Sequence, residues 1–570
     1  MMRINARAAA PRRKKVPEKM PAWTLIIIIF VSAVWLTSCS SFPPPKRQLN
    51  QALLPESFSF YEPSTPQPDK WWKQFHSPEL DELVTSAISG NLTLKQILAR
   101  LEQSEMLARQ ARSGLFPTLN LTGDFSATRR HIDTGVDIPP WQDASKKVDA
   151  LNTLIKNLSP IETQDPLQAA ANSLRSAQSS LNALQTLTEA PPSAESTLIT
   201  HTYRFGLASS YEADLWGRVR AQNRAASLDY AAAQEDTYAA MLTLSGQVVS
   251  QWLGVLALRQ ELNLVRRQLE LNKTTLDLIE LRFQKGRATA LDVLQQRQAV
   301  AQTESLIPGL EANLKTAEQD LAVLLGRQPT TDLKIAQDGF PEAGPMPDVG
   351  LPAELLAKRP DVRARGLQLQ AADWRVSAAR ADRLPSIRLT ASASYGADTT
   401  ELILNNWLAT LAASLTNPIF DAGRRKAEVF RTRAVAKERL AAYEQTVLTA
   451  IKEVESALVQ ERKQREYLES LQRELAAART AHAQAFERYR KGLNDYLPVI
   501  SALTQLQSLE RKQVQANLAY LNIRVRLALA LGGTWMMDDL SMISQNESKK
   551  DNPGDNQRQS SSSETVKGND

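Results

Sequence analysis

The chain contains an internal tandem duplication. The pentapeptide Arg-Phe-Gln-Lys-Gly that ends at Gly286 returns as Arg-Tyr-Arg-Lys-Gly ending at Gly492, and 206 positions separate the two glycines. Two further pairs of glycines have the same separation: Gly217 with Gly423, and Gly326 with Gly532. A register kept over this length indicates a duplicated structural unit, so the fold of the first half must be adopted twice.

The first 38 residues are typical of an export signal peptide. Seven basic residues and one Glu in the first 19 positions precede an apolar run from Trp23 to Leu36. Cys39 is the only cysteine, and the Leu-Thr-Ser before it resembles a bacterial lipobox, in which the thiol accepts a diacylglycerol. By resemblance to sorted bacterial lipoproteins, Ser40 indicates the outer membrane. The alternative is an uncleaved signal anchor with a buried cysteine.

The charge balance changes when this leader is removed. The whole chain has 68 Lys and Arg against 62 Asp and Glu, and residues 1–38 hold 7 and 1 of them, which leaves 61 against 61. This neutral remainder gives no support for nucleic acid as a general partner. After Leu36 no run approaches the roughly 20 apolar residues of a membrane helix. If the mature chain crosses a bilayer, we expect it to do so as β-strands.

Four segments alternate apolar and polar residues. A period of two over about ten residues is what a tilted membrane strand requires, with apolar side chains toward lipid and polar ones toward a watery lumen. A soluble, half-buried hairpin gives the same pattern, and the lipid anchor favours the membrane. The four segments are 119–128, 199–215, 387–396 and 407–416.

Each repeat also predicts a very long helix. No proline occurs between Gly217 and Phe283, where apolar residues recur every three or four positions, and the second copy repeats this pattern up to Tyr489. About 65 residues at 1.5 Å each make a rod on the order of 100 Å long. No compact domain requires such a rod.

A return helix is expected after the glycine that ends each rod, beginning near Ala290 and near Leu497. Each repeat is therefore a strand pair that leads into a helical hairpin. Pro498 falls in the first turn of its return helix, where a missing N–H is harmless. Pro308 lies inside the other return helix and should bend or break it, because the Glu304 carbonyl loses its partner.

Four strands cannot close a membrane barrel by themselves. The smallest closed membrane barrels have eight strands, and each backbone group left unpaired in lipid costs several kcal/mol. We therefore expect the chain to associate with copies of itself. These patterns alone permit two, three or more copies.

A series of motifs along the chain resembles the TolC-like outer-membrane factors, in particular their lipoprotein branch, often called NodT-like. The resemblance extends from about Cys39 to Trp535. The motifs are Trp71-Trp72, Leu80-Asp-Glu-Leu83, Leu215-Trp-Gly-Arg218, Arg359-Pro-Asp-Val-Arg363, Leu384-Pro-Ser-Ile387, Pro418-Ile-Phe-Asp-Ala-Gly423 and Ala530-Leu-Gly-Gly533.

This resemblance implies a mixed α and β membrane protein. It implies a homotrimer whose twelve-strand β-barrel, with four strands per chain and outer-membrane lipid around it, continues into a long periplasmic α-helical barrel of coiled coils. It also implies a periplasmic adaptor protein and an inner-membrane transporter as partners. A mixed equatorial region is expected from residues 51–75, 327–352 and the C-terminal part.

The family's functional residues lie at the periplasmic tips of the hairpins, which meet the adaptor and close the aperture. By position, Asp292 and Tyr489 are the candidates for a closing link between inner and outer coils; Asp292 as a solvated turn residue is the alternative. The second copy departs from the pattern, since Pro498 and Ser501 stand where family members often carry Asp, so Asp495 is the nearest acid. The tip candidates for adaptor contact are mostly basic: Arg282, Lys285, Gly286, Arg287, Arg488, Arg490, Lys491 and Gly492.

Catalytic and metal-binding patterns are missing from the sequence. Its four histidines are scattered, and it has one cysteine, no Gly-rich phosphate loop and no nucleophile elbow. We therefore predict no enzyme activity, no metal site and no cofactor, and we expect Trp71 and Trp72 to be core or interface anchors.

The first strand pair carries an insertion. Pro117 and Pro385 correspond to each other but lie 268 positions apart instead of 206, which places about 62 additional residues mainly within 132–195. Two amphipathic stretches, 148–158 and 167–184, predict a helical cap over the extracellular mouth, with a mobile loop as the alternative. The predicted divisions are 1–38 signal peptide, 39–114 N-terminal segment and first helix, 115–327 repeat one, 328–361 linker and mixed equatorial region, 362–535 repeat two, and 541–570 disordered tail.

The functional prediction is a passive conduit across the outer membrane for small molecules delivered by an inner-membrane pump. Two alternatives remain open: an outer-membrane channel for protein secretion, and a coiled-coil structural lipoprotein without a pore. The paired alternating strands favour a conduit, because a periplasmic spacer has no use for them.

Overall fold

The computed structural model of the chain describes residues 42–45, 55, 58, 70–132, 175, 179, 196–350, 352, 357–398, 406–533 and 535–537. The predicted signal peptide, Cys39 and the tail 541–570 lie outside these residues, as does the insertion apart from Ile132, Arg175 and Ser179. The chain divides into two compact units, a helical unit and a sheet unit made of Pro117–Ala213 and Ile387–Leu415.

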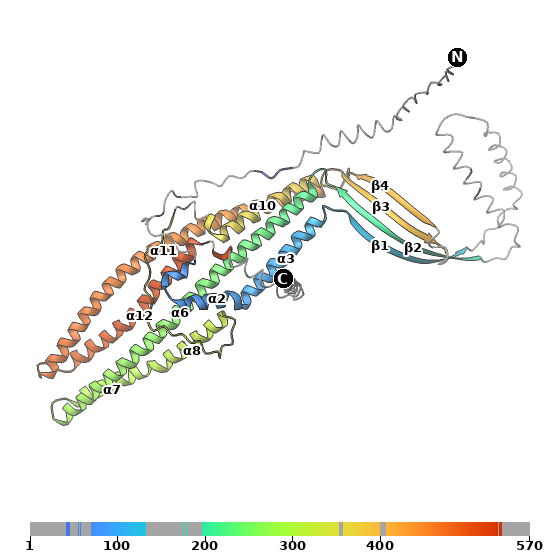
Figure 1. Cartoon of the computed structure of the whole chain (residues 1–570). Coiled ribbons are helices and arrows are strands. Elements are labelled where there is room, and N and C mark those ends of the chain that lie inside the picture. The colour runs from blue at the N-terminus through green and yellow to red at the C-terminus, as the bar shows by residue number, and fades with distance from the viewer. Residues whose placement is uncertain are drawn as a thin grey trace, which may run out of the picture. The chain divides into compact units, whose positions relative to one another are not determined.

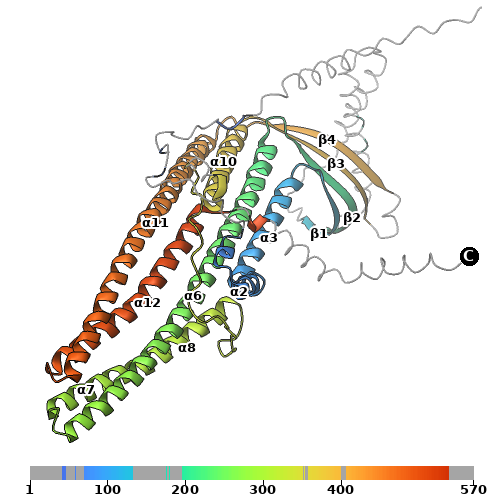
Figure 2. The same ribbon diagram turned by 60° about the vertical axis from the view of Figure 1, so that its left-hand side comes forward.

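Two helices of 67 residues each dominate the helical unit, α6 (Arg218–Gln284) and α11 (Arg424–Arg490). The chain returns along α6 as α7 (Ala290–Glu304) and α8 (Leu306–Leu324), and along α11 as α12 (Leu497–Leu531). Figures 1 and 2 show these two hairpins side by side, with α12 next to α6. The predicted pair of long helical hairpins is therefore present.

Shorter helices extend both hairpins. The segment before the first strand forms η2 (Trp71–Phe75), α2 (Pro78–Gly90) and α3 (Leu92–Ser113), and α3 packs against α6. The corresponding helix of the second repeat, α10 (Pro360–Ala381), packs against both α6 and α11.

The duplication extends further toward the N-terminus than the sequence boundaries placed it. Leu92 and Pro360 begin α3 and α10, Ser113 and Ala381 end them, and both pairs are 268 positions apart. The start of repeat one at residue 115 stays a prediction, and the equal offsets at both ends of α3 and α10 favour a repeat that also includes α3. The insertion between the strands changes the offset between the repeats from 206 to 268. The equivalence of α3 and α10 is therefore not visible at the 206-residue spacing of the glycines.

Both repeats join their helices end to end in the same way. Asn91 Nδ2 donates to the Leu324 carbonyl at 2.8 Å, where the end of α8 meets the start of α3. At the equivalent place Arg359 Nη1 donates to the Ala530 carbonyl at 3.2 Å, where α12 meets α10. Two different side chains thus satisfy the same unpaired carbonyl at a helix C-terminus.

The first return helix is interrupted and the second is continuous. α7 ends at Glu304 and α8 begins at Leu306, with Ser305 between them. The predicted break near Pro308 is confirmed, and its cause is the missing N–H of the proline. α12 runs without interruption and has Pro498 in its first turn, as predicted.

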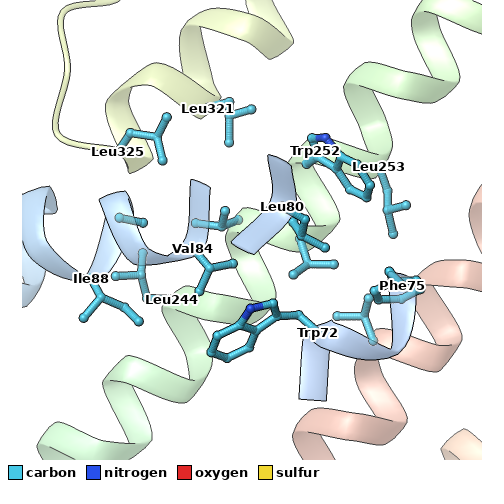
Figure 3. Close-up of a cluster of buried hydrophobic side chains, with 14 of the residues drawn as sticks. Trp72, Phe75, Leu80, Val84, Ile88, Leu244, Trp252, Leu253, Leu321 and Leu325 are labelled. Carbon is cyan, nitrogen blue, oxygen red and sulfur yellow. The ribbon is translucent and has the colours of Figure 1, made fainter. Parts of the chain in front are cut away.

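The main hydrophobic core forms where η2, α2, α6 and α8 meet. Figure 3 shows Trp72, Leu80, Trp252 and Leu321 in this cluster, and each is at most 2% exposed. Segments distant in sequence also contribute, among them Leu333 and Trp535. Trp71 and Trp72 are core residues, as expected, and Trp71 Nε1 donates to Ser245 Oγ at 3.1 Å.

One helix is more apolar than the sequence reading allowed. α6 contains an 18-residue window with a mean hydropathy of 1.4. By length and composition this helix could span a membrane, which corrects the expectation that no segment after Leu36 is apolar enough. Of that window, 67% is buried inside the protein. Its hydropathy comes from core residues such as Met241, Val248 and Leu253, which are 0% exposed, and a buried core helix accounts for it.

The sheet unit is a four-stranded sheet in the order β1-β2-β3-β4. The four predicted strands are present as β1 (Thr118–Ile132), β2 (Ser196–Ala213), β3 (Ser386–Ala397) and β4 (Trp407–Thr416). β1 pairs with β2 and β2 with β3 in antiparallel register. β1 and β4 are the edges of this sheet, so each has one side without a strand partner among the described residues.

The strand register places the apolar alternates on one face. Leu121 lies opposite Leu207 and Phe125 opposite Tyr203, while Phe205 lies opposite Tyr395. These side chains are not buried within the chain: Leu119 is 69% exposed, Phe125 62% and Leu411 84%. An exposed apolar face of this extent needs an apolar environment outside the chain.

Candidate functional site

Both hairpin turns follow the same backbone pattern. Gly286 and Gly492 have φ of 68° and 74°, the left-handed conformation that ends many helices and that glycine adopts without steric cost. The N–H of Gly286 donates to the Phe283 carbonyl at 2.9 Å, and that of Gly492 to the Tyr489 carbonyl at 2.9 Å. These two glycines, 206 positions apart, therefore allow the left-handed backbone at both turns, as the repeat predicts.

Asp292 forms the cap of the first return helix. Thr289 is the N-cap of α7, and its side chain accepts from the Asp292 N–H at 3.2 Å. In return, Asp292 Oδ2 accepts from the Thr289 N–H at 2.9 Å. This reciprocal pair satisfies two N–H groups that a helix start leaves without partners.

The two hairpin tips pack on each other through an apolar cluster. Its buried members come from α6, α7, α11 and the start of α12: Ile279, Val293, Tyr489, Tyr496 and Val499. The rings of Tyr489 and Tyr496 lie 5.2 Å apart between centroids, and the Arg282 guanidinium lies 4.6 Å from the centroid of Tyr489. Arg282 also donates to the carbonyls of Tyr489 and Arg490 at 3.3 Å each. The tips of one chain are therefore held together by an arginine as well as by apolar contact.

Tyr489 is buried with an unsatisfied hydroxyl. The residue is 5% exposed, and its Oη has no hydrogen-bond partner among the residues that the structure describes. Burial raises the pKa of Tyr489, the charge of Asp292 raises it further, and Arg282 lowers it. Asp292 and Tyr489 are thus electrostatic neighbours within one chain, but no hydrogen bond joins them there. A buried hydroxyl without a partner costs about 1–3 kcal/mol.

A polar column runs between the two hairpins above this cluster. We use this name for six residues that are at most 7% exposed: Tyr496, Gln296, Asn272, Thr303, Gln507 and Gln268.

The end of the column nearest the tip links α12 to α7 and α6. The Tyr496 hydroxyl donates to Gln296 Oε1, and Gln296 Nε2 donates to the Asn272 carbonyl at 2.6 Å. Burial raises the pKa of Tyr496, so its hydroxyl remains a donor at neutral pH.

The middle of the column joins all three helices. Asn272 Nδ2 donates to Thr303 Oγ1 at 2.8 Å, and Gln507 Nε2 donates to Asn272 Oδ1 at 2.9 Å. Further along, Gln268 Nε2 donates to the Gln507 carbonyl at 3.2 Å, and Arg511 donates to Gln268 Oε1 at 2.7 Å. Buried amides paired in this way fix one register of the two hairpins, because a shifted register leaves them unpaired.

The remaining candidate residues lie at the surface of the tips. Asp495 is exposed, and so are the basic candidates apart from the half-buried Arg282: Lys285, Arg287, Arg488, Arg490 and Lys491. Arg490 pairs with Glu487 at 3.0 Å within α11. The structure thus brings Asp292, Tyr489 and Arg282 together, and Lys285, Arg287, Arg488 and Lys491 remain exposed at the surface of the tips.

The sequence analysis did not find the polar column. Asn272 lies within the long apolar pattern of α6, and nothing next to it in the sequence marks it as a buried amide. Amides at seam positions of a coiled coil, here Gln296 and Gln507, are the signal that could have indicated a buried network.

Comparison with known proteins identifies the family. The sequence pattern described as outer membrane efflux protein matches residues 83–327 and 351–533. The chain belongs to the outer membrane efflux protein family. It is an outer-membrane component of an efflux system. The family consists of transport conduits.

Relatives in this family are similar over most of their length. The pyoverdine export outer membrane protein OpmQ of Pseudomonas aeruginosa is 32% identical over 474 residues, which cover 82% of this chain and 88% of OpmQ. The toluene efflux pump outer membrane protein TtgF of Pseudomonas putida is 29% identical over 518 residues, covering 88% and 95%. Among solved structures, the outer-membrane channel OprN superposes with a TM-score of 0.70 at 26% identity over 86% of this chain and 99% of OprN.

Proposed function

We propose that three copies of this chain form a passive conduit that carries small molecules across the outer membrane. The observation that carries this proposal is the sheet unit, which has two unpaired edges and an exposed apolar face. Three four-stranded sheets joined edge to edge give twelve strands, which pairs every edge and turns the apolar faces toward lipid. In this proposal the helical hairpins continue the conduit into the periplasm.

The number of copies is tested by native mass spectrometry of the protein released from detergent micelles. Three copies per particle are expected, and dissociation to single chains in mild detergent would contradict the proposed barrel, because a lone four-stranded sheet cannot close. Protein with the sheet residues 118–213 and 386–416 replaced by short Gly/Ser linkers is the matched control and should remain monomeric.

The hairpin tips are proposed to close the conduit and to receive the partner adaptor. Asp292 and Tyr489 are the proposed closing link between neighbouring coils, and the unpartnered hydroxyl of Tyr489 is the group that such a link would satisfy. The exposed cations of the tips favour an acidic adaptor surface. A periplasmic adaptor and an inner-membrane transporter complete this proposed system.

Small molecules are the proposed cargo. The two relatives described above are named for export of pyoverdine and of toluene, which differ widely in polarity. A conduit whose lumen does not discriminate between compounds explains this range. We therefore propose that the partner transporter determines which compound is exported.

Cys39 is proposed as the lipid attachment site, since it is the only thiol and follows a lipobox-like sequence. Mass spectrometry of the mature N-terminus should find a diacylglycerol on Cys39. The variant Cys39→Ser should remain an uncleaved precursor, and an unmodified Cys39 in mature protein would refute the assignment.

A further inference from the structure

A cavity lies among four helices of the helical unit. It has a volume of about 520 Å³ and lies between α6, α11, the start of α10 and the end of α12. Figures 1 and 2 show these helices next to one another. Small-molecule sites in proteins usually have volumes of roughly 300–1,000 Å³ and often form between the helices of a bundle. The space is therefore sufficient for a small organic ligand, and we call it the inter-helix cavity.

The floor of the inter-helix cavity is apolar. Leu242 of α6, Ala457 of α11 and Ala530 of α12 contribute to it, and each is at most 7% exposed. Leu529 of α12, which is half-buried, also lines the cavity. α12 approaches α6 closely here because α6 has Gly246: a Cβ at that position would lie 2.4 Å from Leu529 Cδ1. An apolar floor favours a ligand with an apolar body over a bare inorganic ion.

One wall of the cavity is a buried ion cluster. Arg359, the N-cap residue of α10, is 8% exposed. Its Nε and Nη2 donate to the two carboxylate oxygens of Asp361 at 3.0 and 2.7 Å. Its Nη1 donates to Glu453 Oε2 at 2.6 Å. Asp361 and Glu453 are the two carboxylates that line the cavity, so Arg359 binds both of them.

Two further cations line the cavity, Lys452 of α11 and Arg526 of α12. Both side chains are exposed. Within the part of the chain that the structure describes, neither has a hydrogen-bond or ion-pair partner. Three cations and two carboxylates line the cavity, which gives it one net positive charge. Unpaired donors around a space of net positive charge favour a monovalent anion as the ligand.

The duplication does not explain these two cations. The positions 206 residues earlier, which correspond to Lys452 and Arg526, hold Gly246 and Asp320. The fold of the repeat therefore requires no cation at either position, since the first repeat forms the same helices with a glycine and an acid there. The positive charge of the cavity belongs to the second repeat alone.

We propose that the inter-helix cavity binds a small organic carboxylate. The carboxylate group of the ligand pairs with Lys452 and Arg526, and its apolar body covers Leu242 and Leu529. The planar guanidinium of Arg526 matches the geometry of a carboxylate. This inference goes beyond the proposed conduit, because the cavity is formed by one chain and does not depend on the number of copies.

The charges that line the cavity select a carboxylate over a phosphate. A phosphate dianion exceeds the single net positive charge, and the Asp361 and Glu453 carboxylates repel it. A bare phosphate also leaves the apolar floor uncovered. A monovalent carboxylate with an aromatic or aliphatic body satisfies the cations and the floor together.

A ligand in the cavity should stabilise the packing of the two hairpins. It contacts α6, α11 and α12 at once, and the cavity exists only where these helices pack together. A compound that binds only the folded chain raises its stability by mass action. Benzoate should therefore raise the melting temperature of the purified protein, measured by circular dichroism. Benzamide, which has nearly the same size and no charge, should raise it much less, and an equal shift would contradict the role of the cations.

Photolabelling locates the site. 4-Benzoylbenzoate is a photoreactive aromatic carboxylate. On illumination with the purified protein, it should label peptides that contain residues 449–460 and 526–530, and the labelling should saturate with concentration. 4-Methylbenzophenone has the same photoreactive body without the charge, and at equal concentration it should label these peptides about tenfold less.

Two substitutions test the cations. Lys452→Met and Arg526→Met each remove a charge, keep an apolar stem and break no hydrogen bond or ion pair within the described part of the chain. Each should reduce labelling by 4-benzoylbenzoate about tenfold at subsaturating concentration, while labelling by 4-methylbenzophenone stays unchanged. Lys437→Met is the matched control, because Lys437 is an exposed cation of α11 outside the cavity. It should be labelled as strongly as the original chain.

The outcomes decide the proposal without reference to the conduit. Labelling confined to the strands would show that 4-benzoylbenzoate only enters the detergent micelle, and it would overturn the site, as would no labelling at all. Equal labelling of the original chain and both methionine variants would also overturn it. None of these results depends on the number of copies that native mass spectrometry finds, so the conduit and this site can fail separately.

Discussion

At the scale of single residues, the polar column determines how the two hairpins fit. Gln296 and Gln507 are long polar side chains that a coiled coil usually holds at its surface, yet they are 0% and 7% exposed. Their burial is tolerated because the amide of each one donates a hydrogen bond to another helix, and Asn272 on α6 accepts both. Such a network contributes more to a unique register than to net stability.

The losses from removing two members of the column should not add, because each single removal leaves the other member buried without its partner. Asn272→Leu leaves the Gln507 amide buried without an acceptor, and Gln507→Leu leaves Asn272 Oδ1 without a donor, so each should lower the free energy of unfolding by about 1–3 kcal/mol. The double variant removes both partners and should lose less than the sum of the two. Circular dichroism on heating measures this, with the exposed Thr504→Ala as control. Additive losses would show that the two amides are not coupled.

The tip residues predict two separable effects on closure. Asp292→Ala removes the reciprocal cap of α7, worth about 1 kcal/mol, and should raise single-channel conductance. Tyr489→Phe removes a buried hydroxyl that has no partner within the described part of one chain, so it should raise the free energy of unfolding of the chain by up to about 1–3 kcal/mol. If the hydroxyl links neighbouring coils when the conduit is closed, this variant also raises conductance. Unchanged conductance in Tyr489→Phe would exclude the link and leave Asp292 as a helix cap.

At the scale of elements, the two hairpins have the same length but not the same stiffness. The return path of the first breaks between Glu304 and Leu306, while α12 is continuous. Val514 occupies the place in α12 that corresponds to Pro308, so one residue difference accounts for the break. We expect the first hairpin to bend at this point more readily than the second.

Pro308→Val should repair the break. The new N–H can donate to the Glu304 carbonyl and continue α7 into α8. Hydrogen exchange followed by mass spectrometry should then show slower exchange for peptides covering residues 304–309, with peptides of α12 unchanged as the internal reference. Exchange as fast as in the original chain would mean that packing, and not the proline, interrupts the helix.

The sequence predicts those elements whose signal is local. The strands follow from a local alternation, as at Leu119, Leu121 and Phe125. The turns follow from the glycines that end both long helices, and the helix break follows from Pro308. The repeat membership of α3 could not be read in the same way, because the insertion changes the spacing. The polar column was missed for another reason: Tyr496 and Gln296 are 200 positions apart, and only the packing of three helices brings them together.

At the scale of the whole molecule, one chain is visibly incomplete. Among the residues that the structure describes, its sheet has two edges without a strand partner, its apolar strand face is exposed, and α3 and α11 each have a side with exposed residues. A closed ring of copies satisfies all three at once, because it pairs the edges, orders the apolar faces toward lipid and covers the helices. These observations come from both units of the chain and point to the same arrangement.

The insertion gives a prediction about the outer mouth of the conduit. Residues 132–195 are proposed to form a helical cap there, a proposal that rests on the amphipathic pattern of the sequence. Deleting 133–195 in the Asp292→Ala background, in which the tip is expected to be open, should leave the number of copies at three and increase the entry of bulky external solutes, measured by uptake of large dyes into proteoliposomes. Unchanged uptake in the deletion variant would contradict a cap.

The central claim is that this chain forms a closed but openable conduit, and conductance of the purified protein in planar lipid bilayers tests it most directly. We expect discrete single-channel steps that are small for the original chain and several times larger for Asp292→Ala, since the tip is proposed as the narrowest point of the conduit. The chain with its strands replaced by linkers should give no steps. Bilayers that remain silent with both the original chain and Asp292→Ala, although native mass spectrometry shows three copies inserted, would contradict the conduit.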